Sequence, residues 1–207
     1  MKRLRIGIDC DGVLADFKFA YTTEMQRLYP DVPGLVHNTS QMLGWEVTLW
    51  PGVTQEMRKA TWKFVTNSRD WWLTLAPLAN FAERQAITLL TQRHDVFIIT
   101  ARRDTKGYPV SHQTWRWLGN HGIHGVSVIV TEQKGLVAHA LDLDFFLDDK
   151  PSNCEEVNEA TNSCKVFLRE WNWNSRVPMN WNIGSVKSLV EFLSRIQEVE
   201  ATRDHPC

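Results

Sequence analysis

The sequence predicts an α/β fold: a doubly wound, Rossmann-like parallel sheet with a helical cap inserted after the first strand. Two observations lead to this prediction. Short apolar segments typical of buried strands alternate with segments of helical periodicity. One interval, between the first strand and the next clear strand near Asp95, is too long for a single crossover helix. With 207 residues, 43% of them hydrophobic, the chain can bury one core domain and carry an insertion.

The first elements define the expected insertion. Residues 3–8 form a short apolar segment that ends on acidic residues, which is typical of a buried strand that stops at a functional edge. A helix is expected over Phe17–Leu28, where apolar residues recur at helical spacing until Pro30 stops it. Residues 31–51 look irregular, a second helix is expected over 54–66, and residues 71–75 form an apolar connector. The expected domains are therefore a core of residues 1–16 and 76–207 and a helical cap of residues 17–75.

The rest of the chain alternates strands and helices. Asn80 can cap a helix that runs to about Leu90, and Pro109 can open a helix that ends near Gly122. Strands are expected over 95–100, 126–130, 144–147 and 164–168, and further helices after Lys134, from Ser152 and from Ser185. Such alternation implies βαβ units and a parallel sheet.

Composition and charge exclude several classes of protein. The chain has 23 Lys and Arg against 24 Asp and Glu, so no polymeric nucleic acid is expected as a partner. No apolar run approaches the roughly 18 residues needed to span a bilayer. The apolar part that follows the basic start is too short for a signal peptide and is interrupted by two aspartates, so we expect a cytoplasmic protein without a membrane partner. The four cysteines show no zinc spacing, Cys10 reads as a buried spacer, and the seven histidines are expected at the surface or at helix ends.

Reactive and polar residues follow four of the predicted strands. Because ligands bind outside the carboxyl ends of strands in such sheets, these residues should converge. Clustered carboxylates repel unless a cation neutralises them, and hard oxygen ligands select Mg²⁺. A lysine and a hydroxyl beside Mg²⁺ suit a phosphoryl group, which an aspartate can accept covalently. The converging residues are Asp9, Asp11, Thr100, Ala101, Arg102, Lys134, Asp148, Asp149 and Lys150.

Other charged and aromatic residues allow two interpretations. Arg102 and Arg103 are interpreted as rim charges rather than phosphate clamps, and Lys150 could compete with Lys134 for the phosphate. Five tryptophans of the cap could stack on a base, but most are expected to pack its core, with one or two touching substrate: Trp45, Trp50, Trp62, Trp71 and Trp72. No acidic residue is obviously placed to bind a ribose 2'-hydroxyl, although Asp31, Asn38, Glu46 or Asn67 could reach the sugar.

The segment Asp9–Phe17, DCDGVLADF, resembles the first motif of the haloacid dehalogenase (HAD) superfamily of phosphatases. Thr100, Lys134 and the pair Asp148–Asp149 fall in the order of its second, third and fourth motifs. Within the superfamily, DGVLADF together with FFLDDKP most resembles the 5'(3')-deoxyribonucleotidase family. The resemblance implies hydrolysis of nucleoside monophosphates and a helical cap after the first motif. The segment from Leu168 to Asn172 matches that family only loosely.

The resemblance also implies roles for the converging residues. Asp9 would be the nucleophile and a Mg²⁺ ligand, and Asp11 the general acid/base with its backbone carbonyl on the metal. Asp148 and Asp149 would complete the metal site. The substrate-binding residues would be Phe17 at the cap entrance, Thr100, Ala101, Arg102, Lys134 and Lys150.

Two other functions remain open at this stage. The same chemistry could act on another small phosphomonoester, such as a sugar phosphate. The chain could also be a non-catalytic phosphate-sensing module, but such a module needs no acid/base two residues after its acceptor aspartate, so Asp11 favours turnover. The expected partner is a small nucleoside monophosphate, and a homodimer is left open.

Overall fold

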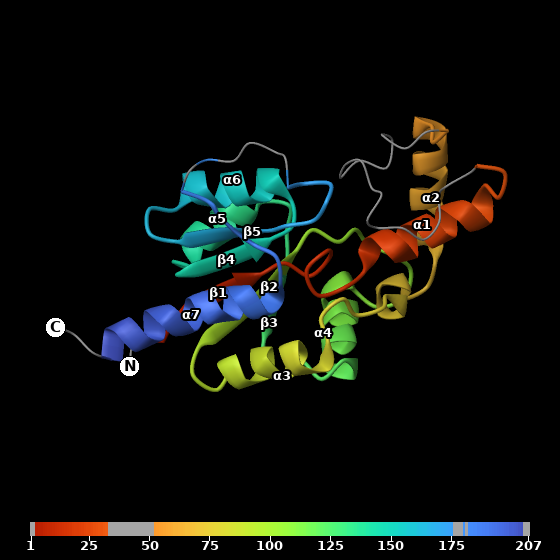
Figure 1. Ribbon diagram of the computed structural model, residues 1–207. Helices are drawn as coiled ribbons and strands as arrows, with labels where there is room; N and C mark the ends of the chain where they lie inside the picture. Colours follow the sequence, from red (N-terminus) through yellow and green to blue (C-terminus); the bar gives the residue numbers. More distant parts are fainter. Residues whose placement is uncertain (1–2, 33–51, 176–179, 181, 205–207) are drawn as a thin grey trace.

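The computed structural model describes residues 3–32, 52–175, 180 and 182–204. Within them, six strands form one sheet in the order β3-β2-β1-β4-β5-β6, and every neighbouring pair is parallel (Figure 1). The predicted doubly wound parallel sheet is confirmed. The strands are β1 Arg5–Ile8, β2 Asp95–Thr100, β3 Ser127–Val130, β4 Phe145–Asp148, β5 Lys165–Arg169 and β6 Gly184–Val186.

Helices follow most of the strands, and those that begin after Asp16 and Asn80 have side-chain caps that the sequence provides. The Asp16 carboxylate accepts the Phe19 N–H at 3.0 Å, and Asn80 and Glu83 form a reciprocal capping box at 3.0 and 2.8 Å. The helices are α1 Phe17–Leu28, α2 Gln55–Asn67, the 3₁₀ helix η3 Trp71–Thr74, α3 Phe81–Leu90, α4 Val110–Asn120, α5 Lys134–Ala140, α6 Pro151–Ala160 and α7 Leu189–Asp204.

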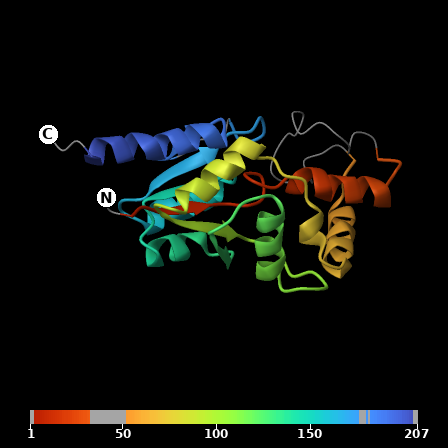
Figure 2. The ribbon, with the colours of Figure 1, turned by 90° about the horizontal axis from the view of Figure 1, so that it is seen from below.

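The two faces of the sheet bury separate apolar clusters because side chains alternate along each strand. Ile6 and Ile8 of β1 face one cluster with residues of α3, α4 and α7. Phe146 of β4 and Ile99 of β2 face the other cluster with residues of α5 and α6. Figures 1 and 2 show these helices covering the sheet, with both chain ends at the end away from α1 and α2.

One predicted element is wrong. Ser185 and Val186 were expected to begin the last helix, but Gly184–Val186 forms a sixth strand in register with β5, with Phe167 opposite Gly184. The helix begins three residues later, where the Ser188 hydroxyl accepts the Glu191 N–H at 3.1 Å. Val186 lies three residues before Leu189, which is a helical spacing. In the sequence this buried strand residue therefore looked like part of the apolar face of the helix.

A second correction concerns His94, which was expected at the surface or at a helix end. Its side chain is buried, Nδ1 accepts the Leu4 N–H at 3.3 Å, and Nε2 lies 2.7 Å from the Glu200 carboxylate of α7. Since the backbone N–H can only donate, the proton resides on Nε2 and is donated to Glu200. His94 therefore connects α7 to the start of β1.

No helix in the described part of the chain is long and apolar enough to cross a membrane.

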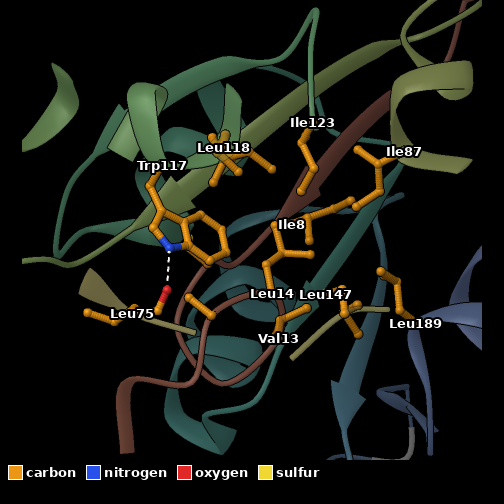
Figure 3. Packing of buried hydrophobic residues seen from close by; sticks show 14 of the residues in the cluster. Ile8, Val13, Leu14, Leu75, Ile87, Trp117, Leu118, Ile123, Leu147 and Leu189 are labelled. Carbon is orange, nitrogen blue, oxygen red and sulfur yellow. Dashed lines mark hydrogen bonds between the residues drawn. The ribbon is translucent and has the colours of Figure 1, made fainter. Parts of the chain in front are cut away.

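The segment between β1 and β2 holds α1, α2, η3 and α3, and both ribbon views place α1 and α2 beyond one end of the sheet (Figures 1 and 2). The residues in and just after η3 are tied to α4. The backbone N–H of Trp72 donates to the Gln113 side-chain oxygen at 3.2 Å. Trp117 donates Nε1–H to the Leu75 carbonyl at 2.7 Å (Figure 3). The division into a core and a cap of residues 17–75 stays a prediction. Trp45 and Trp50 lie outside the described residues.

The buried bond from Trp117 to Leu75 should stabilise the fold measurably. Trp117→Phe leaves the Leu75 carbonyl without its donor inside the core, and we expect the free energy of unfolding to fall by about 1–3 kcal/mol from this loss alone. Trp115→Phe is the matched control on the same helix, because Trp115 is 60% exposed and should change stability by less than about 0.5 kcal/mol. Urea denaturation of both variants measures the difference, and equal stabilities would contradict this role of the bond.

Candidate active site

The carboxyl ends of β1, β2 and β4 meet at one cavity of about 670 Å³. All the loops after these strands contribute to it, as expected for a doubly wound sheet. The cavity also reaches side chains of α1, α2 and η3, so it is closed on one side by the sheet edge and on the other by the insertion. Its lining residues are Asp9, Asp11, Phe17, Trp62, Trp72, Thr100, Ala101, Arg102, Arg103, Glu132, Lys134, Asp149, Lys150, Ser152, Asn153 and Glu156.

Lys134 lies at the centre of the acidic cluster. Its ammonium donates to Asp9 Oδ1 and to Asp148 Oδ2, both at 2.6 Å, and its side chain is almost completely buried. Lys134 is the first residue of α5, so the helix places the ammonium between the ends of β1 and β4. The lysine therefore neutralises two carboxylates that the sheet forces together.

Asp148 is held by Lys134 of α5 and by two donors from its own loop and the helix that follows. It accepts the Lys150 backbone N–H at 2.8 Å and the Asn153 amide at 3.0 and 3.2 Å, in addition to Lys134. Pro151 occupies the first position of α6, where its missing N–H costs no hydrogen bond. Because the helix begins there, Asn153 lies in its first turn and its side chain reaches back to Asp148. Sequence reasoning did not single out Asn153, although its position one turn into the helix after the acid was a usable signal.

Asp149 has a different environment. Both of its carboxylate oxygens are buried, and neither accepts a hydrogen bond from any residue that the structure describes. Ligand oxygens of Asp9, Asp148 and Asp149 lie within 4.8 Å of one another. Burial without donors disfavours the ionised carboxylate unless a cation lies beside it, and an all-oxygen set of this kind suits Mg²⁺. The residues present therefore fit the predicted metal.

Glycine is required at position 12 because of this carboxylate. Gly12 has φ +84°, and a Cβ placed there would lie 1.9 Å from Asp149 Oδ2. Two residues of the segment after β5 hold the same region: Trp171 donates Nε1–H to the Gly12 carbonyl at 3.0 Å, and Asn174 donates to the Asp149 carbonyl at 2.8 Å. Trp171, in the segment that matched the expected family only loosely, and Asn174 just after it thus support the two acidic loops.

Burial and mutual repulsion dominate the electrostatics of the cluster. Burial raises the pKa of Asp9 to about 7, with Lys134 opposing the shift and the charges of Asp148 and Asp11 adding to it. Burial also raises the pKa of Asp149 well above its usual value, reinforced by Asp148 and Asp9. Burial alone would favour the neutral amine of Lys134, but Asp148 and Asp9 outweigh it and raise the pKa of this lysine. A divalent cation among the carboxylates would favour their ionised forms.

Asp11 is paired with Arg102, which corrects the interpretation of Arg102 as a rim charge. The guanidinium is buried and donates to Asp11 twice, from Nη2 at 2.8 Å and from Nε at 2.9 Å. The Thr100 hydroxyl lies 3.4 Å from Asp11 Oδ2. The interpretation of Arg102 was wrong because two consecutive arginines after a strand usually point to solvent, whereas only Arg103 is exposed.

Cys10 is buried as expected. Its sulfur accepts a hydrogen bond from Arg102 at 3.2 Å, and burial raises the pKa of its thiol.

Aromatic rings line the side of the cavity away from the sheet. The Phe17 ring stacks on Trp62 and Trp72, with ring centres 5.7 and 5.9 Å apart, and the Arg103 guanidinium lies 4.7 Å from the centre of the Trp62 ring. Trp71 is buried against Trp72 and does not line the cavity. The structure thus brings two of the cap tryptophans to the cavity and leaves a third in the core.

The structure brings every predicted site residue to this one cavity or its wall. Thr100, Ala101 and Lys150 line it, and Asp148 lies directly behind Lys134. Four further lining residues were not foreseen: Glu132, Ser152, Asn153 and Glu156. They lie on the loop before α5 and on the first turns of α6, so the helix starts that follow predicted strands were the available signal.

The fold and the acidic edge define a hydrolase fold of the HAD class. A HAD-like hydrolase of Streptococcus pneumoniae superposes with a TM-score of 0.57 at 12% identity, covering 94% of this chain and 99% of that one. The L-2-haloacid dehalogenase of Xanthobacter autotrophicus gives 0.56 at 13%, covering 95% and 99%, and the magnesium-bound HAD hydrolase YfnB of Bacillus subtilis gives 0.53 at 14%, covering 95% and 99%. These likenesses establish the fold.

The family follows from sequence similarity. The model of the family "5' nucleotidase, deoxy (Pyrimidine), cytosolic type C protein" matches residues 2–174, and the chain belongs to this family. The mouse mitochondrial 5'(3')-deoxyribonucleotidase is 28% identical over 157 residues, which are 72% of this chain and 66% of that protein. The human protein of the same name is 27% identical over 159 residues, 72% of this chain and 64% of that protein. The chain thus matches just under two thirds of the length of these relatives.

Removing the central lysine should destabilise the protein when no metal is present. Lys134→Met leaves Asp9 and Asp148 buried without their shared cation, and we expect the free energy of unfolding in chelator to fall by about 3–5 kcal/mol. Lys59→Met, which changes an exposed lysine of α2, is the control and should have little effect. Denaturant titrations of both variants in chelator make the comparison. A Lys134→Met protein as stable as the control would show that the lysine does not neutralise the cluster.

Proposed function

We propose that this chain is a Mg²⁺-dependent phosphatase that hydrolyses nucleoside 5'-monophosphates, with a preference for deoxyribonucleotides, through a phosphoryl group carried on Asp9. The observation that supports this most is the composition of one cavity. Its sheet side holds the cluster of Asp9, Lys134 and Asp149, and its opposite side is formed by Phe17, Trp62 and Trp72. The first set suits a phosphate and the second set suits a nucleobase.

In the first half of the proposed reaction, an Asp9 carboxylate oxygen attacks phosphorus and the bond from phosphorus to the 5' oxygen breaks. Asp11 gives its proton to the departing 5' oxygen, which leaves as the nucleoside hydroxyl. Lys134 and Thr100 border the position where the phosphoryl oxygens would lie and can donate to them.

In the second half, water attacks the phosphorus of the aspartyl phosphate while Asp11 takes a proton from that water. The bond to Asp9 breaks, inorganic phosphate leaves, and both aspartates return to their starting states. Asp11 thus serves as acid and then as base, which explains why a carboxyl group is needed two residues after the nucleophile.

Asp9, Asp148 and Asp149 would hold Mg²⁺, and the backbone carbonyl of Asp11 is proposed as a further ligand. When bound, the ion supplies positive charge that lowers the repulsion between the phosphate and the carboxylates. Lys134 donates to Asp9 and would hold the nucleophile in place beside the ion.

The aromatic wall supports a nucleotide over a sugar phosphate. Each base that stacks on an aromatic side chain gains roughly 1–3 kcal/mol, which a sugar ring alone does not obtain to the same extent. The presence of Asp11 beside the nucleophile supports turnover over a phosphate-sensing module. A cytoplasmic location and a small-molecule partner remain predictions from the sequence.

A phosphate-release assay over the common nucleoside monophosphates, with Mg²⁺ or with chelator, tests the proposal. We expect turnover with Mg²⁺, none in chelator, and poor support by Ca²⁺, whose larger and looser shell misplaces the reacting groups. Asp9→Asn should lower turnover by at least about three orders of magnitude because it removes the nucleophile. Asp95→Asn, at the opposite end of the sheet, is the control and should stay active. An Asp9→Asn enzyme with a tenth of normal activity would refute the assignment.

The sugar preference can be tested separately with matched substrates such as dUMP and UMP. Asp31 and Asn67 do not line the cavity, and Asn38 and Glu46 lie outside the described residues. A ribose 2'-hydroxyl buried without a partner costs about 1–3 kcal/mol, so kcat/KM should favour the deoxyribonucleotide by roughly 5- to 150-fold. Equal values, or a preference for UMP, would refute the deoxy preference and leave the phosphatase assignment intact.

A further inference from the structure

Arg102 is, with Lys134, one of the two buried cations that line the cavity. Its side chain has no exposed surface. Nε and Nη2 donate to the two oxygens of Asp11, Nη2 also contacts Cys10 Sγ, and Nη1 donates to the Thr114 hydroxyl of α4 at 3.1 Å. All three nitrogens therefore have partners within the protein.

Two tryptophan rings confine the guanidinium as well. Its central carbon lies 4.8 Å from the ring centre of Trp72 and 5.8 Å from that of Trp117. Trp117 is itself fixed by its bond to the Leu75 carbonyl. Arg102 is thus held by η3 and α4, and it cannot turn toward a ligand without breaking several contacts at once.

We propose that Arg102 is a positioning residue that orients the Asp11 carboxylate for its two proton transfers, rather than a group that binds the phosphate. The inference rests on the proposed function, because it concerns how Asp11 performs the role assigned there. The two-point contact of a planar guanidinium with a carboxylate fixes the plane of the carboxylate, which a single contact cannot do. Both oxygens of Asp11 accept from Arg102, and Asp11 still lines the cavity from which the 5' oxygen and water would approach it.

The size of the expected effect follows from the demands of proton transfer. A misplacement of about 1 Å can lower turnover by about 100-fold. Arg102→Met removes the fork, and Arg102→Lys retains a charge but can make only one point of contact. Thr114→Val retains the fork and removes only its anchor on α4. The three variants should therefore lower kcat for a nucleotide in the order Met, Lys, Val, with the first near 100-fold and KM nearly unchanged.

The experiment compares these variants on an alkyl phosphate and on an aryl phosphate, alone and combined with Asp11→Asn. Arg3→Met, which removes an arginine from an exposed pair with Asp95, is the matched control. The aryl leaving group needs little protonation, so the loss from Arg102→Met in the rate of the first step, measured as release of the leaving group in a single turnover, should be at least about tenfold smaller for it. In the Asp11→Asn background, Arg102→Met should add no more than about a twofold loss, because both changes disable the same group.

The outcomes separate the inference from the proposed function. A raised KM for both phosphates, or a loss that multiplies with that of Asp11→Asn, would show that Arg102 binds phosphate and would overturn the inference alone. A wild-type chain that hydrolyses no phosphomonoester would refute the proposed function and the inference with it. Melting temperatures identify any variant that fails to fold, and if Arg102→Met does so, Arg102→Lys and Thr114→Val decide by the same leaving-group comparison.

Discussion

The ammonium of Lys134 makes it possible to bury the acidic edge of this sheet. Parallel pairing brings the ends of β1 and β4 side by side, so Asp9 and Asp148 are forced together in a site that excludes water. Lys134 donates to both at 2.6 Å and offsets their repulsion, while Asp149 remains without donors. Lys134 is therefore a cation built into this cluster, and the negative charge that it leaves favours a divalent cation beside the three carboxylates.

The other parts of the site are arranged around this balance. Gly12 leaves room for the Asp149 carboxylate, and Asn174 and Trp171 hold the two loops from the far side. Arg102 pairs with Asp11 in the same way that Lys134 pairs with Asp9, so each aspartate of the first loop has its own fixed cation. The two aspartates are two residues apart, yet their different partners allow them to take different roles in the proposed chemistry.

The strands and the acidic residues could be predicted because their signals are local. Buried segments such as Asp95–Thr100 are short and apolar, and the aspartates directly follow them. The missed features depend on tertiary contacts: β6 exists because β5 offers a free edge, His94 is buried because α7 returns over β1, and Arg102 is buried because η3 and α4 enclose it. Of the cap tryptophans, only the folded chain distinguishes Trp62 and Trp72, which line the cavity, from Trp71, which does not.

The central claim is that Asp9 carries the phosphoryl group while its neighbours neutralise charge and move protons. Asp11→Asn, supplied with an aryl phosphate and Mg²⁺, should form the phosphorylated enzyme and lose its phosphate slowly, because the base that activates water is missing. Acid quenching, borohydride reduction and peptide mass spectrometry then locate the modified residue. The account predicts that Asp9 is converted to homoserine in the quenched, substrate-treated enzyme and in no untreated sample. Modification of another residue, or none during active turnover, would contradict it.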